Sequence, residues 1–139
     1  MLSASVRATL ARAVNDRTTV DERDLDILAV RGAMVAHNPG SNMRLGNGIA
    51  DVNSMLERGI TVGLGTDGSN SGDNQNMYEA MRLASFSSKV RGPDTERWVT
   101  TEQSLYAATE GSARCLGMGE QLGRLEPGRK ADIVFLDLA

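Results

Sequence analysis

Two short apolar runs, each ending abruptly in a polar turn, constrain the fold of this chain more than any other feature. The first run is Ala33–Ala36, and it is followed by the turn 37–42. The second is Ile60–Gly65, and it is followed by Thr66-Asp67-Gly68. Short apolar strands that alternate with helices predict an α/β fold whose parallel sheet is buried on both faces. In such folds, functional side chains lie on the loops at the carboxyl ends of the strands, so these two turns are the candidate site.

The segments around the two strands carry signals for helix starts and ends. Thr19 and Glu22 have capping-box spacing, and Gly32 suits the end of that helix. Asp51 can cap a helix that reaches Arg58. Further helices are expected over residues 3–15 and 76–89.

The second half of the chain has one more clear helix. Thr100–Gln103 is a second capping-box pattern, and it opens a helix whose inner side we expect to carry Leu105, Ala108, Ser112 and Leu116. The loop 37–50 holds too many Pro and Gly residues for regular structure. A final strand is expected over residues 131–138.

Composition excludes several classes of function. The 139 residues suffice for one ordinary core, and 15 Lys and Arg against 18 Asp and Glu leave no basic patch that would indicate nucleic-acid binding. No window approaches the length of a membrane span, so no membrane partner is expected and the cytoplasm is the default location. Cys115 is the single cysteine, which excludes an internal disulfide and favours a buried, inert thiol.

Asp67 is the strongest candidate for chemistry. A carboxylate at the end of a strand could bind a divalent cation and exchange a proton with metal-bound water. The alternative is a turn aspartate that accepts a hydrogen bond from its own backbone. The surrounding glycines resemble a phosphate-binding loop, but the Lys-Ser/Thr ending of that motif is missing.

The other polar residues of the two turns and helices have less specific signals. His37, the only histidine, could be a ligand, a substrate donor or a structural group, and Ser41 and Asn42 could bind substrate or stabilise the turn. Asp73 and Glu110 are expected to be a solvated loop acid and a helix-surface acid. Glu79 and Arg82, three residues apart on a helix, are expected to form a surface ion pair.

Several ordered motifs from about Asp21 to Leu138 resemble the C-terminal part of amidohydrolase-superfamily enzymes, in the branch of cytosine, guanine and adenosylhomocysteine/methylthioadenosine deaminases and triazine hydrolases. The matching runs are Val35-Ala36-His37-Asn38-Pro39, Ser41-Asn42-Met43-Arg44-Leu45, Gly48-Ile49-Ala50, Leu64-Gly65-Thr66-Asp67-Gly68, Met77–Ala84, Ala108–Arg114 and Gly123–Val134.

The resemblance implies a partial (β/α)8 barrel over residues 19–117, the start of a small β-sandwich over 118–139, and an unplaced helix over 1–18. It also implies a zinc or iron centre in which Asp67 is a metal ligand and proton carrier. His37, Ser41 and Asn42 then support the pocket rather than bind metal. The implied reaction is hydrolytic deamination or dechlorination of an N-heterocycle.

The family's other histidines and its catalytic glutamate have no counterpart in this sequence. A centre of three histidines and one aspartate cannot be built from one histidine, so we expect the chain alone to bind no metal and to be inactive. Three interpretations stay open: a fragment of a hydrolase, a non-catalytic remnant that self-associates, and a half-enzyme complemented by another barrel segment. Open sheet edges favour homo-oligomers or such a complement.

Overall fold

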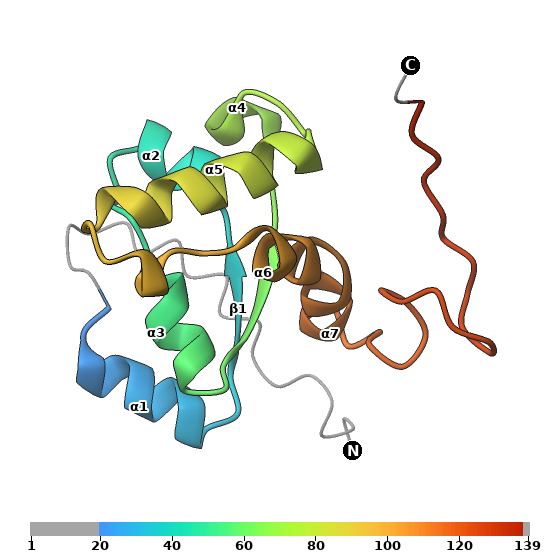
Figure 1. Ribbon diagram of the computed structural model, residues 1–139, viewed down its shortest axis with the longest axis horizontal. Coiled ribbons are helices and arrows are strands. Elements are labelled where there is room, and N and C mark those ends of the chain that lie inside the picture. Colours follow the sequence, from blue (N-terminus) through green and yellow to red (C-terminus); the bar gives the residue numbers. More distant parts are fainter. Residues whose placement is uncertain (1–19, 138–139) are drawn as a thin grey trace.

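The computed structural model describes residues 20–137, in which helices surround a small parallel sheet (Figure 1). The elements, in chain order, are α1 (Glu22–Val30), β1 (Met34–His37), α2 (Pro39–Arg44), α3 (Val52–Glu57), β2 (Thr61–Leu64), α4 (Ser69–Gly72), α5 (Met77–Val90), the 3₁₀ turn η1 (Thr95–Arg97), α6 (Thr101–Tyr106), the π-helical turn η2 (Ala107–Gly111) and α7 (Ser112–Cys115).

The sheet confirms the predicted parallel α/β arrangement. β1 and β2 pair in parallel, with Met34 opposite Thr61 and His37 opposite Leu64. The Gly65 amide donates to the His37 carbonyl at 2.9 Å, which extends the pairing beyond the last ladder residues. The carboxyl ends of both strands therefore lie at the same edge, and the turns after them meet.

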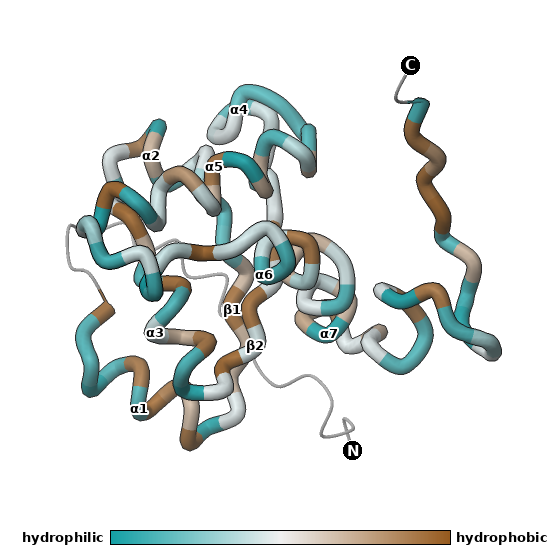
Figure 2. Tube along the Cα trace, viewed as in Figure 1, coloured by the Kyte–Doolittle hydropathy of each residue, from teal (hydrophilic) through white to brown (hydrophobic). Residues whose placement is uncertain are grey.

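The larger of two hydrophobic core clusters lies between the strands and the helices before them, and the smaller one consists of Leu64, Ala84 and Ala107. Apolar stretches of α1, α3 and the strands gather in the lower half of the molecule (Figure 2). The buried residues of this larger cluster are Leu25, Val52, Met55, Ile60, Val62 and Val99. The helix cap at Asp51 is formed as predicted, because the Asp51 side chain accepts from the Ser54 amide.

Small residues allow the segment α6–η2–α7 to approach β2 closely. A Cβ atom added to Gly111 would lie 2.1 Å from the carbonyl oxygen of Val62, and one added to Gly63 would lie 2.9 Å from the Ser112 Cα. Ser112 Oγ accepts from the Leu64 amide at 3.1 Å and lies 2.8 Å from the Leu64 carbonyl oxygen. Only glycine fits at these two contacts.

This close approach corrects the predicted inner side of the last helix. Leu105 and Leu116 are 54% and 72% exposed, whereas Ser104, Ala107 and Ala113 are buried. The π turn at η2 shifts the helical register, and backbone contact with β2 selects small side chains over leucines. The predicted helix position was right, and Ala108 and Ser112 do lie on its inner side, but Leu105 and Leu116 do not.

Three local predictions also differ from the structure. The first helix is capped by a capping box of Asp21 and Asp24, whereas Thr19, the predicted cap, lies outside the described residues. The predicted loop 37–50 contains α2, since Pro39 occupies a first-turn position where a missing amide hydrogen costs nothing. Asp73, expected in a loop, is the C-cap of the short helix α4.

Residues 131–137 do not form the strand that was predicted over 131–138. The helix expected over 3–15 lies outside the described residues. Between residues 20 and 137, no helix is both long and apolar enough to cross a bilayer.

Candidate functional site

The two polar turns meet through a hydrogen bond between Ser41 and Asp67. Ser41 Oγ donates to Asp67 Oδ2 at 2.7 Å, although the two residues are 26 positions apart. Helix α2 begins directly after β1 and places Ser41, 2% exposed, beneath the loop that follows β2. The structure therefore joins two of the predicted site residues.

The Asp67 backbone adopts a left-handed conformation, with φ of 59°. Its Oδ1 atom accepts from the Gly68 amide at 2.7 Å, so the turn bond considered in the sequence is present beside the Ser41 contact. The hydrogen bond from Ser41, followed by those from Gly68 and Ser71, lowers the pKa of Asp67. The exposed carboxylate is thus held ionised, which suits a cation ligand.

Close backbone packing supports this loop. A Cβ atom added to Gly65 would lie 2.4 Å from Asn38 Oδ1, so a side chain at position 65 would displace Asn38. The side-chain Nδ2 of Asn38 donates to the Ala36 carbonyl at 3.3 Å. These contacts fix the path of the chain from β2 into Asp67.

His37 is buried at the end of β1, with 3% of its surface exposed. Its Nε2 atom has no hydrogen-bond partner among the described residues. Burial lowers the pKa of His37 to about 4, because the charged imidazolium would lose its hydration. The imidazole is therefore neutral near pH 7.

Asn42 is half-buried, and its backbone amide donates to the Asn38 carbonyl in the first turn of α2. Arg44, two residues further on, forms an ion pair with Asp73, which joins α2 to the loop after α4. Asp73 is exposed, as predicted, but it is not an isolated acid.

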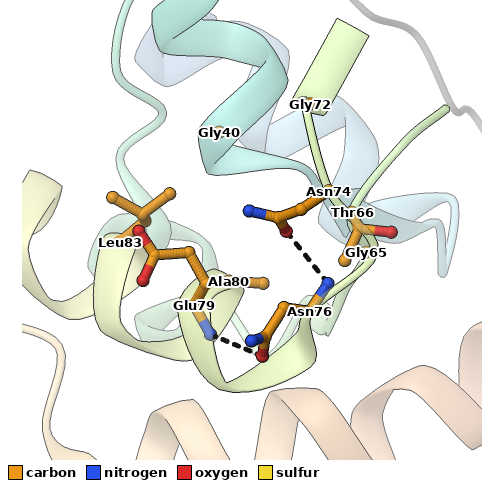
Figure 3. Close-up of a pocket in the computed structure, with 9 residues that line it drawn as sticks. All are labelled: Gly40, Gly65, Thr66, Gly72, Asn74, Asn76, Glu79, Ala80 and Leu83. Carbon is orange, nitrogen blue, oxygen red and sulfur yellow. Dashed lines mark hydrogen bonds between the residues drawn. The ribbon is translucent and has the colours of Figure 1, made fainter. Parts of the chain in front are cut away.

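A small cavity lies beside this loop, between α2 and the start of α5 (Figure 3). It encloses about 20 Å³, which is room for one water molecule and not for a heterocycle. The Asn76 side chain accepts from the Glu79 amide at 3.2 Å and so begins helix α5. Arg82 forms the predicted exposed pair with Glu79, at 2.6 Å. The lining residues are Gly40, Gly65, Thr66, Gly72, Asn74, Asn76, Glu79, Ala80 and Leu83.

The donor set does not make a complete metal centre. Within residues 20–137, no group of three or more His, Cys, Asp or Glu side chains could hold a metal ion. Asp67 offers one exposed carboxylate, and His37 is enclosed in the core. The described residues thus offer one ligand of a metal site, Asp67, and not a complete set of ligands.

Glu110 is a charged group whose role the sequence prediction missed. It is 6% exposed instead of lying on a helix surface, and it pairs with Arg114 at 2.5 Å and with Arg124. The hydrogen bond from Arg124, together with that from Arg114, lowers the pKa of Glu110. Arg114 four residues later was the available signal, but the contact with Arg124 depends on the tertiary fold.

The Cys115 thiol lies 3.7 Å from the Val35 carbonyl oxygen and is partly buried. Burial raises the pKa of Cys115, which agrees with the predicted inert thiol.

The sequence from residue 5 to residue 139 matches the Amidohydrolase family. The chain belongs to the amidohydrolase family. A 5-methylthioadenosine/S-adenosylhomocysteine deaminase of Syntrophomonas wolfei is 47% identical over 119 residues, which are 86% of this chain and 27% of the relative. The deaminase of the same name from Desulforamulus reducens is 43% identical over 118 residues, or 85% of this chain and 27% of the relative. The amidohydrolase chain described here thus spans about a quarter of the length of these relatives.

Solved structures of amidohydrolase enzymes have the same fold in this region. An adenosine deaminase of Xanthomonas campestris with bound zinc matches with a TM-score of 0.78 and 32% identity, over 84% of this chain and 26% of that one. An atrazine chlorohydrolase of Arthrobacter aurescens, complexed with zinc, matches with a TM-score of 0.78 and 37% identity, over 84% and 26%. The family predicted from the sequence motifs is therefore confirmed, and so is a fold of the amidohydrolase type in this part of the chain.

Proposed function

We propose that this chain carries the Asp67 corner of an amidohydrolase site that hydrolyses a non-peptide C–N or C–Cl bond of an N-heterocycle. The observation that carries the proposal is the Ser41–Asp67 hydrogen bond. It holds an ionised, exposed carboxylate at the carboxyl end of β2 in a chain whose relatives are deaminases and a chlorohydrolase. In this proposal, residues 19–117 are part of a (β/α)8 barrel and residues 118–139 begin a β-sandwich.

Each proposed site residue has a defined task. Asp67 supplies one oxygen ligand to a zinc or iron ion, and Ser41 fixes the direction of that carboxylate. His37 supports the site as a buried neutral group at the end of β1, and Asn42 of α2 supports the substrate pocket. The metal, when bound, would activate water for attack on the ring carbon.

The remaining metal ligands must come from outside residues 20–137, because the described residues contain no further ligand cluster. We therefore expect the isolated chain to bind no stoichiometric zinc or iron and to be inactive. A complementary barrel segment would restore both. A location in the cytoplasm remains a prediction.

The test is complementation of the purified 139-residue chain. The added segment is the part of the Syntrophomonas wolfei relative that this chain does not match. Bound zinc and iron are measured together with turnover of methylthioadenosine, S-adenosylhomocysteine, guanine and cytosine. Metal and turnover that appear only in the mixture support the proposal, whereas their absence from the mixture contradicts it and favours a non-catalytic remnant.

Asp67→Asn and Asp73→Asn form a matched pair of variants. Both aspartates have positive φ, of 59° and 65°, and asparagine tolerates that conformation. We expect Asp67→Asn to lower complemented turnover by about 100-fold or more, because a neutral amide is a weak ligand and cannot carry a proton. Asp73→Asn should retain turnover within about a factor of three, since the Arg44–Asp73 pair is exposed. Equal losses in both variants would count against a specific role for Asp67.

A further inference from the structure

A second cavity lies among the helices, apart from the Asp67 turn. It encloses about 150 Å³, the volume of a cavity that can hold one benzene molecule. The start of α3, the end of α5 and the turn η1 form its walls, and Figure 1 shows the end of α5 and the turn after it next to the start of α3. The lining residues are Asp51, Ser88, Arg91, Gly92, Asp94, Arg97 and Trp98.

Two guanidinium groups converge on one carboxylate at the wall of this cavity. Arg91 Nη2 donates to Asp51 Oδ2 at 2.9 Å, and Arg97 Nη2 donates to the same oxygen at 3.3 Å. The other oxygen of Asp51 accepts from the Ser54 amide at 3.0 Å. Because one carboxylate balances only one of the two guanidinium charges, a net positive charge remains at this wall.

Neutral groups hold both guanidinium groups in place. Arg91 Nη1 donates to the Ile49 carbonyl at 3.0 Å, and Arg97 Nη2 donates to Ser54 Oγ at 2.8 Å. Among the described residues, these bonds leave Nε of Arg91 and both Nε and Nη1 of Arg97 without an acceptor. Guanidinium N–H groups match the oxygens of carboxylates and phosphates, and donors that are already held lose less entropy when an anion binds.

Trp98 forms a rigid wall beside these donors. Its indole Nε1 donates to the Gly92 carbonyl at 2.9 Å, which fixes the plane of the ring. Lys89 Nζ lies 5.4 Å from the centre of that ring and adds a further positive charge near the cavity. The cavity therefore combines cationic donors with one flat aromatic side.

Asp94 is the second acid that lines the cavity, and it is exposed. Its side chain accepts from the Glu96 amide at 3.1 Å, at the start of η1. The ion pairs at the cavity, in which Arg91 and Arg97 contact Asp51, do not include Asp94. Because water screens an exposed charge, Asp94 should oppose an anion in the cavity only weakly.

We propose that this cavity binds a small oxyanion, a phosphate or carboxylate group, through Arg91 and Arg97. The anion balances the guanidinium charge that Asp51 leaves, and any flat body that carries the anionic group lies against Trp98. Chloride has no pair of oxygens to accept from a guanidinium group, so an oxyanion is preferred. The site is independent of the proposed hydrolytic reaction, because none of its lining residues belongs to the Asp67 site.

Fluorescence of Trp98, the only tryptophan of the chain, reports binding directly. The complete chain is titrated with inorganic phosphate and, separately, with acetate, while chloride keeps the ionic strength at about 0.1 M. We expect a saturable change with a Kd of about 1 mM or lower for at least one of the two oxyanions, and none when chloride alone is varied. No saturation with either oxyanion, or an equal change with chloride, would overturn the proposal.

Variants with opposite expected effects locate the site. Arg97→Gln should raise the Kd by at least about tenfold, because it removes a charged donor. Asp94→Asn should lower the Kd by about threefold, since it removes one exposed negative charge while asparagine can still cap η1. Arg82→Gln is the matched control, because Arg82 is an exposed arginine of α5 that does not line the cavity.

Circular dichroism of each variant reports whether the chain is folded, and the Asp94→Asn result stands even where Arg97→Gln fails to fold. The Arg82→Gln variant should keep its Kd within about a factor of two, as expected for a distant, screened charge. Equal weakening in Arg82→Gln and Arg97→Gln would indicate a nonspecific effect of surface charge and refute the site. Weaker binding in Asp94→Asn would refute it as well.

Discussion

Acid should destabilise this protein through His37 before its carboxylates are protonated. The pKa of His37 falls from 6.5 to about 4 on folding because the imidazole is buried. Between pH 6.5 and pH 4, the imidazole of the unfolded chain is therefore protonated while that of the folded chain stays neutral. The contribution of neutral His37 to the free energy of unfolding is fully present above pH 6.5 and is lost as the pH falls toward 4. Below pH 4 this group causes no further loss.

The size of the loss follows from the two pKa values. The two pKa values differ by about 2.5, and a difference of one pKa unit corresponds to about 1.36 kcal/mol. The free energy of unfolding should therefore fall by about 3 kcal/mol between pH 7 and pH 4, a large part of the about 5–15 kcal/mol typical of a domain. His37 is the only histidine, so no second imidazole contributes.

Guanidinium unfolding followed by circular dichroism at stepped pH measures this loss, and NMR of the single imidazole measures the native pKa. His37→Gln is the control, because glutamine does not titrate. We expect the free energy of unfolding of the variant to be nearly constant between pH 6.5 and 5, whereas that of the wild type falls. A native imidazole resonance that titrates near 6.5, or parallel curves for both proteins, would refute the reasoning.

Two substitutions test the packing against β2. Gly111→Ala should destabilise the protein by at least about 2 kcal/mol, since its Cβ would lie 2.1 Å from the Val62 carbonyl oxygen, whereas Gly92→Ala meets nothing within 4 Å and should be neutral or stabilising. Chemical unfolding compares the two, and equal effects would disprove the close contact. Ser112→Ala should cost about 1–3 kcal/mol because the Leu64 amide loses its partner, and faster exchange of that amide is the specific readout. Unchanged exchange at Leu64 would show that the hydrogen bond is not formed.

Local sequence signals were sufficient for most of the elements. The strand before His37, the strand before Asp67, the cap at Asp51 and the capping box at Thr100 all depend on neighbouring residues, and the structure contains each of them. The family was also readable, because its motifs are contiguous. Contacts within a few residues are encoded locally and need no knowledge of the fold.

The site could be predicted only in part. Asp67 was identifiable as a residue at a strand end, but its partner Ser41 lies 26 residues away, and no local pattern reports that distance. The burial of Glu110 depends likewise on Arg124, which reaches it from a separate turn. The roles of Asp67, His37, Ser41 and Asn42 in catalysis remain proposals.

The sequence by itself determined that helices alternate with two short parallel strands and that polar turns follow both. These features follow from apolar periodicity, glycine and the capping side chains. The tertiary structure decided that Ser41 orients Asp67, that His37 is enclosed and neutral, and that small residues rather than leucines face β2. Those outcomes depend on which backbone segments approach closely enough to exclude water or a Cβ atom, a property of the packed chain and not of any local run of residues.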